Sequence, residues 1–134
     1  MKTINYRGGQ ISTEEPLIMG ILNATPDSFS DGGQFFSAQK ALKRIEVMIN
    51  EGADIIDLGA ESTRPGAKPI SADEEIKRLA PLLAEYKNRF NTPLSIDTTK
   101  ADVAEFALNN GADMINDISG LTADERMIKL IAKK

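Results

Sequence analysis

The chain has 134 residues, 27% of them charged, with a formal net charge of −4, no cysteine and no histidine. That length suits one ordinary domain with a sizeable core, and the scattered lysines and arginines indicate neither nucleic acid nor an anionic membrane surface as a partner. Disulfides, thiolate chemistry and zinc sites with sulfur or imidazole ligands are excluded, so any metal must bind oxygen atoms, and magnesium is the first expectation.

The amino-terminal segment lacks the apolar region of a signal peptide, and no apolar run in the sequence is long enough to cross a bilayer. These features predict a cytoplasmic protein. Residues 2–16 are expected to form a small hairpin or an extended lead-in, with a turn over 7–10 and Pro16 closing the segment.

Residues 17–22 form a short apolar run that is typical of a strand buried on both faces and stops at Asn23. The loop over 25–33 is rich in turn formers and carries Phe29 as a lone aromatic residue, which either touches a ligand or folds back over the core. Apolar residues at helical spacing then predict a helix over 38–50, ended by Gly52.

The rest of the chain continues to alternate strands and helices. A buried strand is expected over 54–59, before a polar loop. Ser71, with Glu74 three residues later, fits a capping box and predicts a helix that runs to about Phe90. A strand, a helix with inward-facing apolar residues, a strand and a final helix are then expected over 94–97, 100–110, 114–116 and 123–134.

An internal repeat supports this organisation. Residues 51–57, Glu-Gly-Ala-Asp-Ile-Ile-Asp, are echoed by residues 110–116, Asn-Gly-Ala-Asp-Met-Ile-Asn, and each copy leaves a helix through glycine and enters a strand. Alternating strands and helices indicate a parallel α/β fold, either an open sheet or part of a barrel. The sequence has no Gly-x-Gly-x-x-Gly motif of dinucleotide-binding sites after its first strand, and no Gly-Lys-Ser/Thr phosphate loop of nucleoside-triphosphate sites.

Polar residues stand at the carboxyl end of every predicted strand. They are Asn23, the segment 61–64, Asp97, and Asn116 with Asp117. In a barrel or a doubly wound sheet these ends meet on one face, where ligands bind. The pattern therefore predicts one ligand-binding rim, although polar residues at strand ends can also pair with each other or with their own loops.

Four segments, 18–33, 52–66 with its Glu-Ser-Thr-Arg-Pro-Gly core, 95–100 and 115–118, resemble the amino-terminal half of dihydropteroate synthase. The resemblance covers nearly the whole chain. It implies an α/β fold in which residues 1–134 form one domain, a four-stranded half of a TIM-type (β/α)8 barrel with an amino-terminal hairpin. It also implies a transferase of folate biosynthesis and a sulfonamide target, which condenses (7,8-dihydropterin-6-yl)methyl diphosphate with 4-aminobenzoate to dihydropteroate and diphosphate.

The resemblance assigns Asn23 to magnesium, Asp97 and Asn116 to the pterin ring, and Thr63 and Arg64 to the diphosphate. The chemistry agrees, because an amide oxygen suits a hard cation that also binds diphosphate, and a carboxylate accepts hydrogen bonds from ring N–H groups. A guanidinium and a hydroxyl fit phosphate oxygens. The alternatives are a strand-end amide bonded to its own loop, polar groups paired with each other, and a solvated surface arginine.

The resemblance further places Phe29, Ser62 and Pro65 at the 4-aminobenzoate pocket, and Asp31 near the reacting carbon. Asp31 and Arg64 are therefore the expected catalytic residues, unless the loop leaves Asp31 in solvent. If diphosphate departs first, the metal and the cationic groups act mainly by holding the leaving group.

The departure from the family is length, because a complete barrel needs about 250 residues. We expect no useful synthase activity from this chain alone, and self-association of two half-barrels through unpaired sheet edges, or a compact marginal half-barrel. Two other interpretations are a pterin-binding domain of a methyltetrahydrofolate-dependent methyltransferase and a non-catalytic assembly module. The loops over 25–31 and 61–65 favour the synthase.

Overall fold

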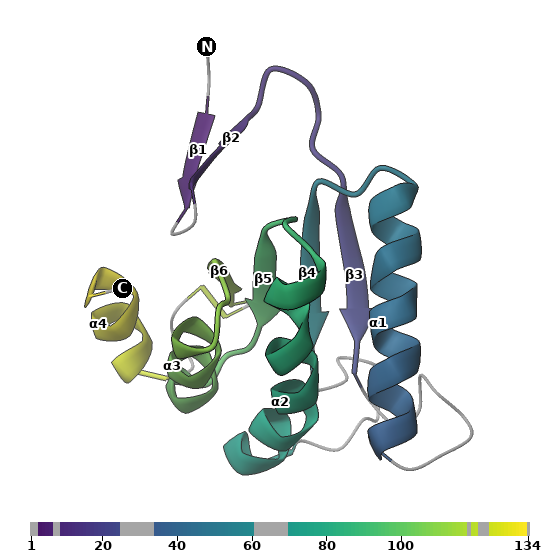
Figure 1. Cartoon of the computed structure of the whole chain (residues 1–134). Coiled ribbons are helices and arrows are strands. Elements are labelled where there is room, and N and C mark those ends of the chain that lie inside the picture. Colours follow the sequence, from purple (N-terminus) through teal and green to yellow (C-terminus); the bar gives the residue numbers. More distant parts are fainter. Residues whose placement is uncertain are drawn as a thin grey trace.

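The computed structural model describes residues 3–6, 9–24, 34–60, 70–117, 119–120 and 124–133. An antiparallel hairpin comes first, followed by strands that alternate with helices (Figure 1). In chain order the elements are β1 (Thr3–Tyr6), β2 (Gly9–Ser12), β3 (Met19–Asn23), α1 (Gln34–Asn50), β4 (Ile55–Gly59), α2 (Ala72–Arg89), β5 (Leu94–Asp97), α3 (Ala101–Asn109), β6 (Met114–Asn116) and α4 (Arg126–Lys133).

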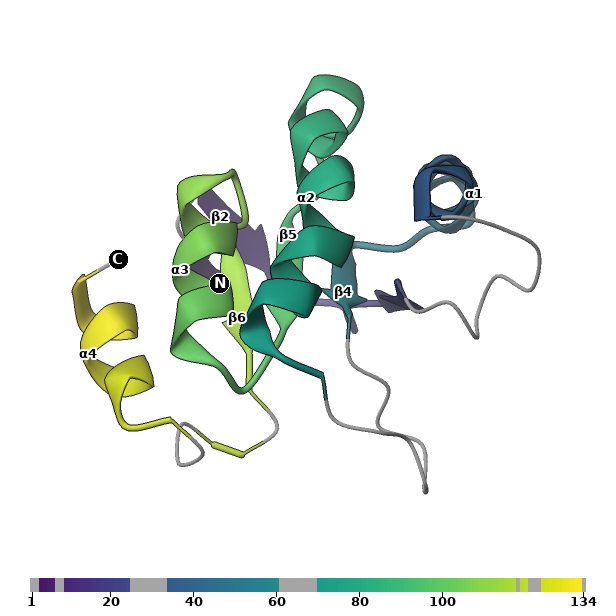
Figure 2. The same cartoon turned by 90° about the horizontal axis from the view of Figure 1, so that it is seen from below.

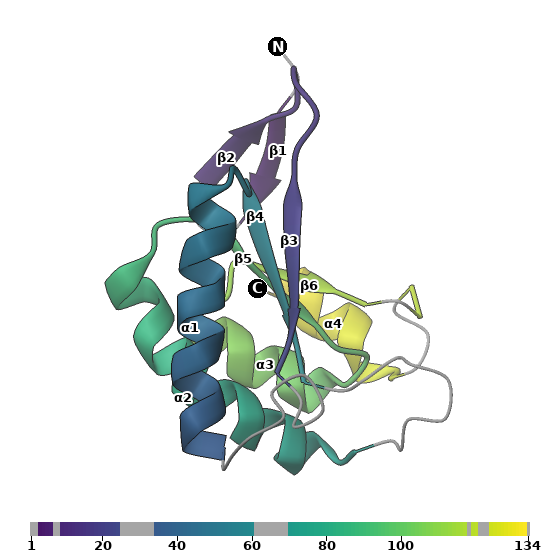
Figure 3. The same cartoon turned by 90° about the vertical axis from the view of Figure 1, so that its right-hand side faces the viewer.

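The four later strands form one parallel sheet in the order β3-β4-β5-β6, which confirms the predicted parallel α/β fold. Helices α1, α2 and α3 cover one face of this sheet (Figure 2). The core lies between the sheet and these helices, where Leu22, Leu58 and Ile96 alternate with residues that point to the other face. In Figure 3 the hairpin lies at the end of the sheet where β3 begins.

Strand β3 differs from the prediction of a strand buried on both faces. Leu22 is buried, but Met19 is 42% and Ile21 is 64% exposed. Within the described residues β3 pairs with β4 alone and so forms an edge of the sheet. Its odd-numbered side chains lie on the face away from the helices and have a described neighbouring strand on one side only, which explains why they are exposed while Asp57 and Ser95 on the same face are buried.

The repeated Gly-Ala-Asp segments make the same two contacts at the amino ends of the strands. Asp54 Oδ2 accepts a hydrogen bond from the backbone N–H of Ile18 at 2.9 Å, and Asp113 Oδ2 accepts one from Leu94 at 2.9 Å. In each copy the aspartate's own N–H donates to the carbonyl of that same residue, at 2.7 Å and 2.8 Å. In each copy the aspartate therefore joins the amino ends of two neighbouring strands, at the end of the sheet opposite the predicted rim.

The helix boundaries follow the sequence signals only partly. The Ser71 hydroxyl accepts from the N–H of Glu74 at 3.1 Å, which confirms the predicted cap of α2. Helix α1 begins four residues before the expected 38, and α4 begins at Arg126 instead of 123. Phe106 of α3, expected to point inward, packs against the core and is partly buried.

Helix α3 is capped from a distant part of the chain. Lys100 provides no side-chain cap, and the N–H of Ala101 instead donates to Asp124 Oδ2 at 2.8 Å. Arg126 donates to both Asp124 and Asp102, and its hydrogen bonds hold the pKa of Asp124 well below the usual range. This network holds the start of α4 against the start of α3.

Among the described residues, no helix combines the length and the apolar character that a membrane span requires.

Candidate functional site

A row of four residues crosses the carboxyl end of the sheet. Asn23 is in register with Gly59, Gly59 with Asp97, and Asp97 with Asn116. Residues in register in a parallel sheet point to the same face, and the row lies on the face away from the helices because its chain neighbours are core residues. The structure thus brings together the three described residues that the sequence predicts to bind magnesium and the pterin. Their roles remain predictions.

Gly59 keeps the centre of this row open. A Cβ atom placed on Gly59 would stand 3.1 Å from Asn23 Oδ1 and 3.5 Å from Asp97 Oδ2, so both oxygens border the same small space. Amide and carboxylate oxygens suit a hard cation, and magnesium commonly keeps several waters and binds few protein groups together with substrate phosphates. The described residues contain no cluster of three or more acidic, histidine or cysteine side chains that could hold a metal. The Asn23 amide oxygen thus fits a magnesium ion that also binds a diphosphate, and the Asp97 carboxylate borders the same space.

A second row lies two residues before the first in β4 and β5. Its residues were not predicted from the sequence as part of the site. Asp57 and Ser95 are in register and both 2% exposed. Asn116 Nδ2 donates to Asp57 Oδ2 over 3.5 Å. Burial raises the pKa of Asp57, and the nearby Ser95 hydroxyl and Asn116 amide partly offset this effect. The available signal was a single carboxylate in the otherwise apolar strand over 55–58.

Helix α2 supports the backbone on which the row is built. The buried Glu75 accepts a hydrogen bond at 3.3 Å from Oγ1 of Thr98, the residue directly after Asp97. Glu75 also pairs with Lys100 Nζ at 2.6 Å. Arg78 donates to the carbonyl of Ala60 at 2.8 Å, directly after Gly59. Two side chains of one helix therefore hold the ends of both central strands.

The remaining predicted site residues belong to the segments 25–33 and 61–69, outside the described residues. They are Phe29, Asp31, Ser62, Thr63, Arg64 and Pro65.

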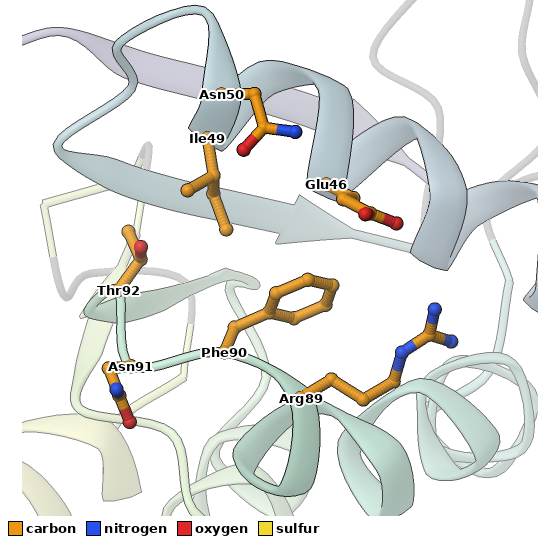
Figure 4. A pocket seen from close by; sticks show the side chains of 7 residues that line it. All are labelled: Glu46, Ile49, Asn50, Arg89, Phe90, Asn91 and Thr92. Carbon is orange, nitrogen blue, oxygen red and sulfur yellow. The ribbon is translucent and has the colours of Figure 1, made fainter.

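A pocket of about 550 Å³ lies elsewhere, between the carboxyl ends of α1 and α2. Figure 4 shows the Phe90 ring between Ile49 of α1 and the Arg89 side chain. The Arg89 guanidinium stands 5.7 Å from the centroid of that ring. The lining residue Thr92 precedes β5, which places the pocket near the amino end of the sheet and apart from the row.

Comparison with known proteins relates the chain to pterin enzymes. Residues 19–134 match the family model described as pterin binding enzyme. The dihydropteroate synthase of Clostridium beijerinckii is 54% identical over 120 residues, which is 90% of this chain and 45% of the relative.

Two solved structures show the same likeness. The dihydropteroate synthase of Xanthomonas albilineans with 4-aminobenzoic acid superposes with a TM-score of 0.90 at 37% identity, covering 98% of this chain and 48% of that one. The Yersinia pestis enzyme in complex with a sulfonamide drug gives 0.86 at 42% identity, over 98% and 48%. The chain therefore spans a little under half the length of these relatives and has the fold of the corresponding part of their barrel.

Proposed function

Since the chain belongs to the family of pterin-binding enzymes, we propose that it forms the amino-terminal part of a dihydropteroate synthase. The proposed reaction forms a bond between the amine nitrogen of 4-aminobenzoate and the methylene carbon of (7,8-dihydropterin-6-yl)methyl diphosphate. The bond from that carbon to the diphosphate oxygen breaks, and the amine loses a proton. Curated relatives at 49–54% identity carry the synthase name, which favours this function over a methyltransferase domain.

The observation that carries the proposal is the row of Asn23, Gly59, Asp97 and Asn116 on one face of the sheet. Asp97 accepts hydrogen bonds from the ring N–H groups of the pterin, and Asn116 binds the same ring through its amide. Asn23 holds magnesium, which supplies charge compensation for the departing diphosphate. The space that Gly59 leaves between Asn23 and Asp97 orients the reacting carbon beside these groups.

The two polar loops complete the proposed site. Thr63 and Arg64 bind the diphosphate, and Asp31 stabilises charge near the reacting carbon. Phe29, Ser62 and Pro65 form the wall for 4-aminobenzoate, where sulfonamides compete. The relatives solved with 4-aminobenzoic acid and with a sulfonamide drug support this part of the proposal.

We also propose that the 134 residues alone do not complete the reaction. We further propose that the protein is cytoplasmic, and fractionation of expressing cells tests this localisation.

Asp97→Ala is expected to weaken binding of the pterin diphosphate about tenfold to a hundredfold, because a hydrogen bond to a charged group contributes roughly 1.5–3 kcal/mol. Isothermal titration of the chain with the pterin diphosphate and magnesium measures this. Asp113→Ala is the matched control, since Asp113 bonds Leu94 and Lys87 at the opposite end of the sheet. An unmodified chain that gives no heat and no shift would leave the assembly-module interpretation.

We further propose that two copies of the chain associate through the β3 edge. Met19 and Ile21 are 42% and 64% exposed on one face of this edge strand, and Ile18, directly before the strand, is 56% exposed. Exposed apolar edge strands favour pairing with another chain. Light scattering is expected to show a dimer that Ile21→Lys dissociates, whereas Ile128→Lys on α4 leaves it intact. A monomer with a cooperative melt would contradict this association.

A further inference from the structure

Asp57 occupies a position that a fold alone does not explain. It lies in the second row, in register with Ile21 and Ser95, and two residues before Gly59, so its side chain points to the same face as the ligand row. Only 2% of it is exposed. Burying a carboxylate is unfavourable, and its replacement by an apolar residue is often neutral or stabilising. A task at the site would account for this residue.

Asp57 interacts with the Ser95 hydroxyl and with the Asn116 amide, and the second of these contacts identifies that task. Its Oδ2 lies 3.5 Å from Asn116 Nδ2, across a sequence separation of 59 residues. A carboxylate only accepts hydrogen bonds, so the Asn116 amide must turn its NH2 group toward it. The reversed amide would set two oxygen atoms against each other. Asn116 Oδ1 is therefore held on the side of the amide that faces away from Asp57.

We propose that Asp57 is a positioning residue that fixes the Asn116 amide, so that Asn116 presents its carbonyl oxygen to the heterocycle. The proposal rests on the proposed function, since it deepens the role of Asn116 in binding the pterin. With Asp97 in the same row, the site then offers two hydrogen-bond acceptors to the ring. It selects a ring edge rich in N–H donors, such as the amino-substituted edge of a pterin.

The proposal makes a claim about selectivity that a purely structural role would not. Lumazine is a close analogue that carries a carbonyl oxygen where pterin carries its 2-amino group. A site with a fixed acceptor discriminates against it, because the lumazine oxygen would leave that acceptor without a hydrogen. If Asn116 can rotate its amide, its NH2 group meets the lumazine oxygen and the discrimination falls.

Fluorescence titrations of the chain with pterin and with lumazine test this claim. The ratio of the two dissociation constants is expected to fall about tenfold in Asp57→Ala. Asp57→Asn keeps an oxygen that can accept from Asn116 Nδ2 and is expected to hold the ratio within about threefold. Asp54→Ala, which removes a strand carboxylate at the opposite end of the sheet, is the control and should leave the ratio unchanged.

The side-chain amide resonances of Asn116 provide a readout that needs no ligand. A proton on Nδ2 bonded to a carboxylate is expected downfield in the unmodified chain and is expected to move upfield in Asp57→Ala. If the unmodified chain binds no pterin, the proposed function fails while this spectrum still tests the contact. If pterin binds and Asp57→Ala leaves both the spectrum and the selectivity ratio unchanged, the positioning role is overturned.

Discussion

Gly59→Ala is expected to weaken binding of the pterin diphosphate with magnesium about a hundredfold, while the sheet stays folded. The added carbon would stand 3.1 Å from Asn23 Oδ1 and 3.4 Å from Asp97 Cβ, closer than most carbon contacts in proteins. Gly59 is not among the glycines with positive φ, so alanine meets no backbone strain there. The methyl group thus fills the space between the Asn23 amide, proposed to bind magnesium, and the Asp97 carboxylate, proposed to bind the pterin. Titration calorimetry and urea unfolding measure the two effects.

Gly20→Ala is the matched control because it changes a glycine of the same sheet on the opposite face. Its Cβ would stand 3.0 Å from Met48 Sδ and 3.2 Å from Ile56 Cδ1, both on the helix side. We expect this variant to lose stability, by about 1–3 kcal/mol, and to keep its affinity for the pterin. A Gly59→Ala chain that binds as tightly as the unmodified one would show that the row does not contact the ligand.

The three polar residues of the first row could be predicted from sequence because their placement depends on local rules. Strand ends are visible where an apolar run meets a polar residue, as at Asn23, Asp97 and Asn116. Parallel strands place such ends on one edge, which the observed sheet order confirms. The cap of α2 was equally local, since Ser71 and Glu74 are three residues apart.

The second row could not be predicted because its contacts join distant parts of the chain. Asp57 and Asn116 meet only after β4, β5 and β6 are in register. The cap of α3 by Asp124 is non-local in the same way. The exposure of Ile21 depends on whether a further strand pairs with the other edge of β3. An apolar run in the sequence does not show whether its strand lies at an edge or in the middle of a sheet.

Glu75→Ala is expected to destabilise the chain by about 2–3 kcal/mol. The change leaves the Lys100 ammonium and the Thr98 hydroxyl without the carboxylate that they now contact. Breaking a buried ion pair usually has a larger effect, but the Lys100 side chain is 28% exposed and water replaces part of the interaction. Urea unfolding at pH 7 measures the change. Glu74→Ala, next in the chain, removes a half-buried pair with Arg78, whose guanidinium keeps its bond to the Ala60 carbonyl, and should change stability by less than about 1 kcal/mol.

The double variant Glu75→Leu, Lys100→Met separates stability from site geometry. An apolar pair of similar volume is expected to restore most of the stability, because neither charge is then buried alone. It restores no anchor for Thr98, whose backbone follows Asp97 directly, so we expect pterin affinity to stay below that of the unmodified chain. If affinity recovers together with stability, Glu75 serves the fold alone. If stability recovers and affinity does not, helix α2 positions Asp97, the carboxylate proposed to bind the pterin.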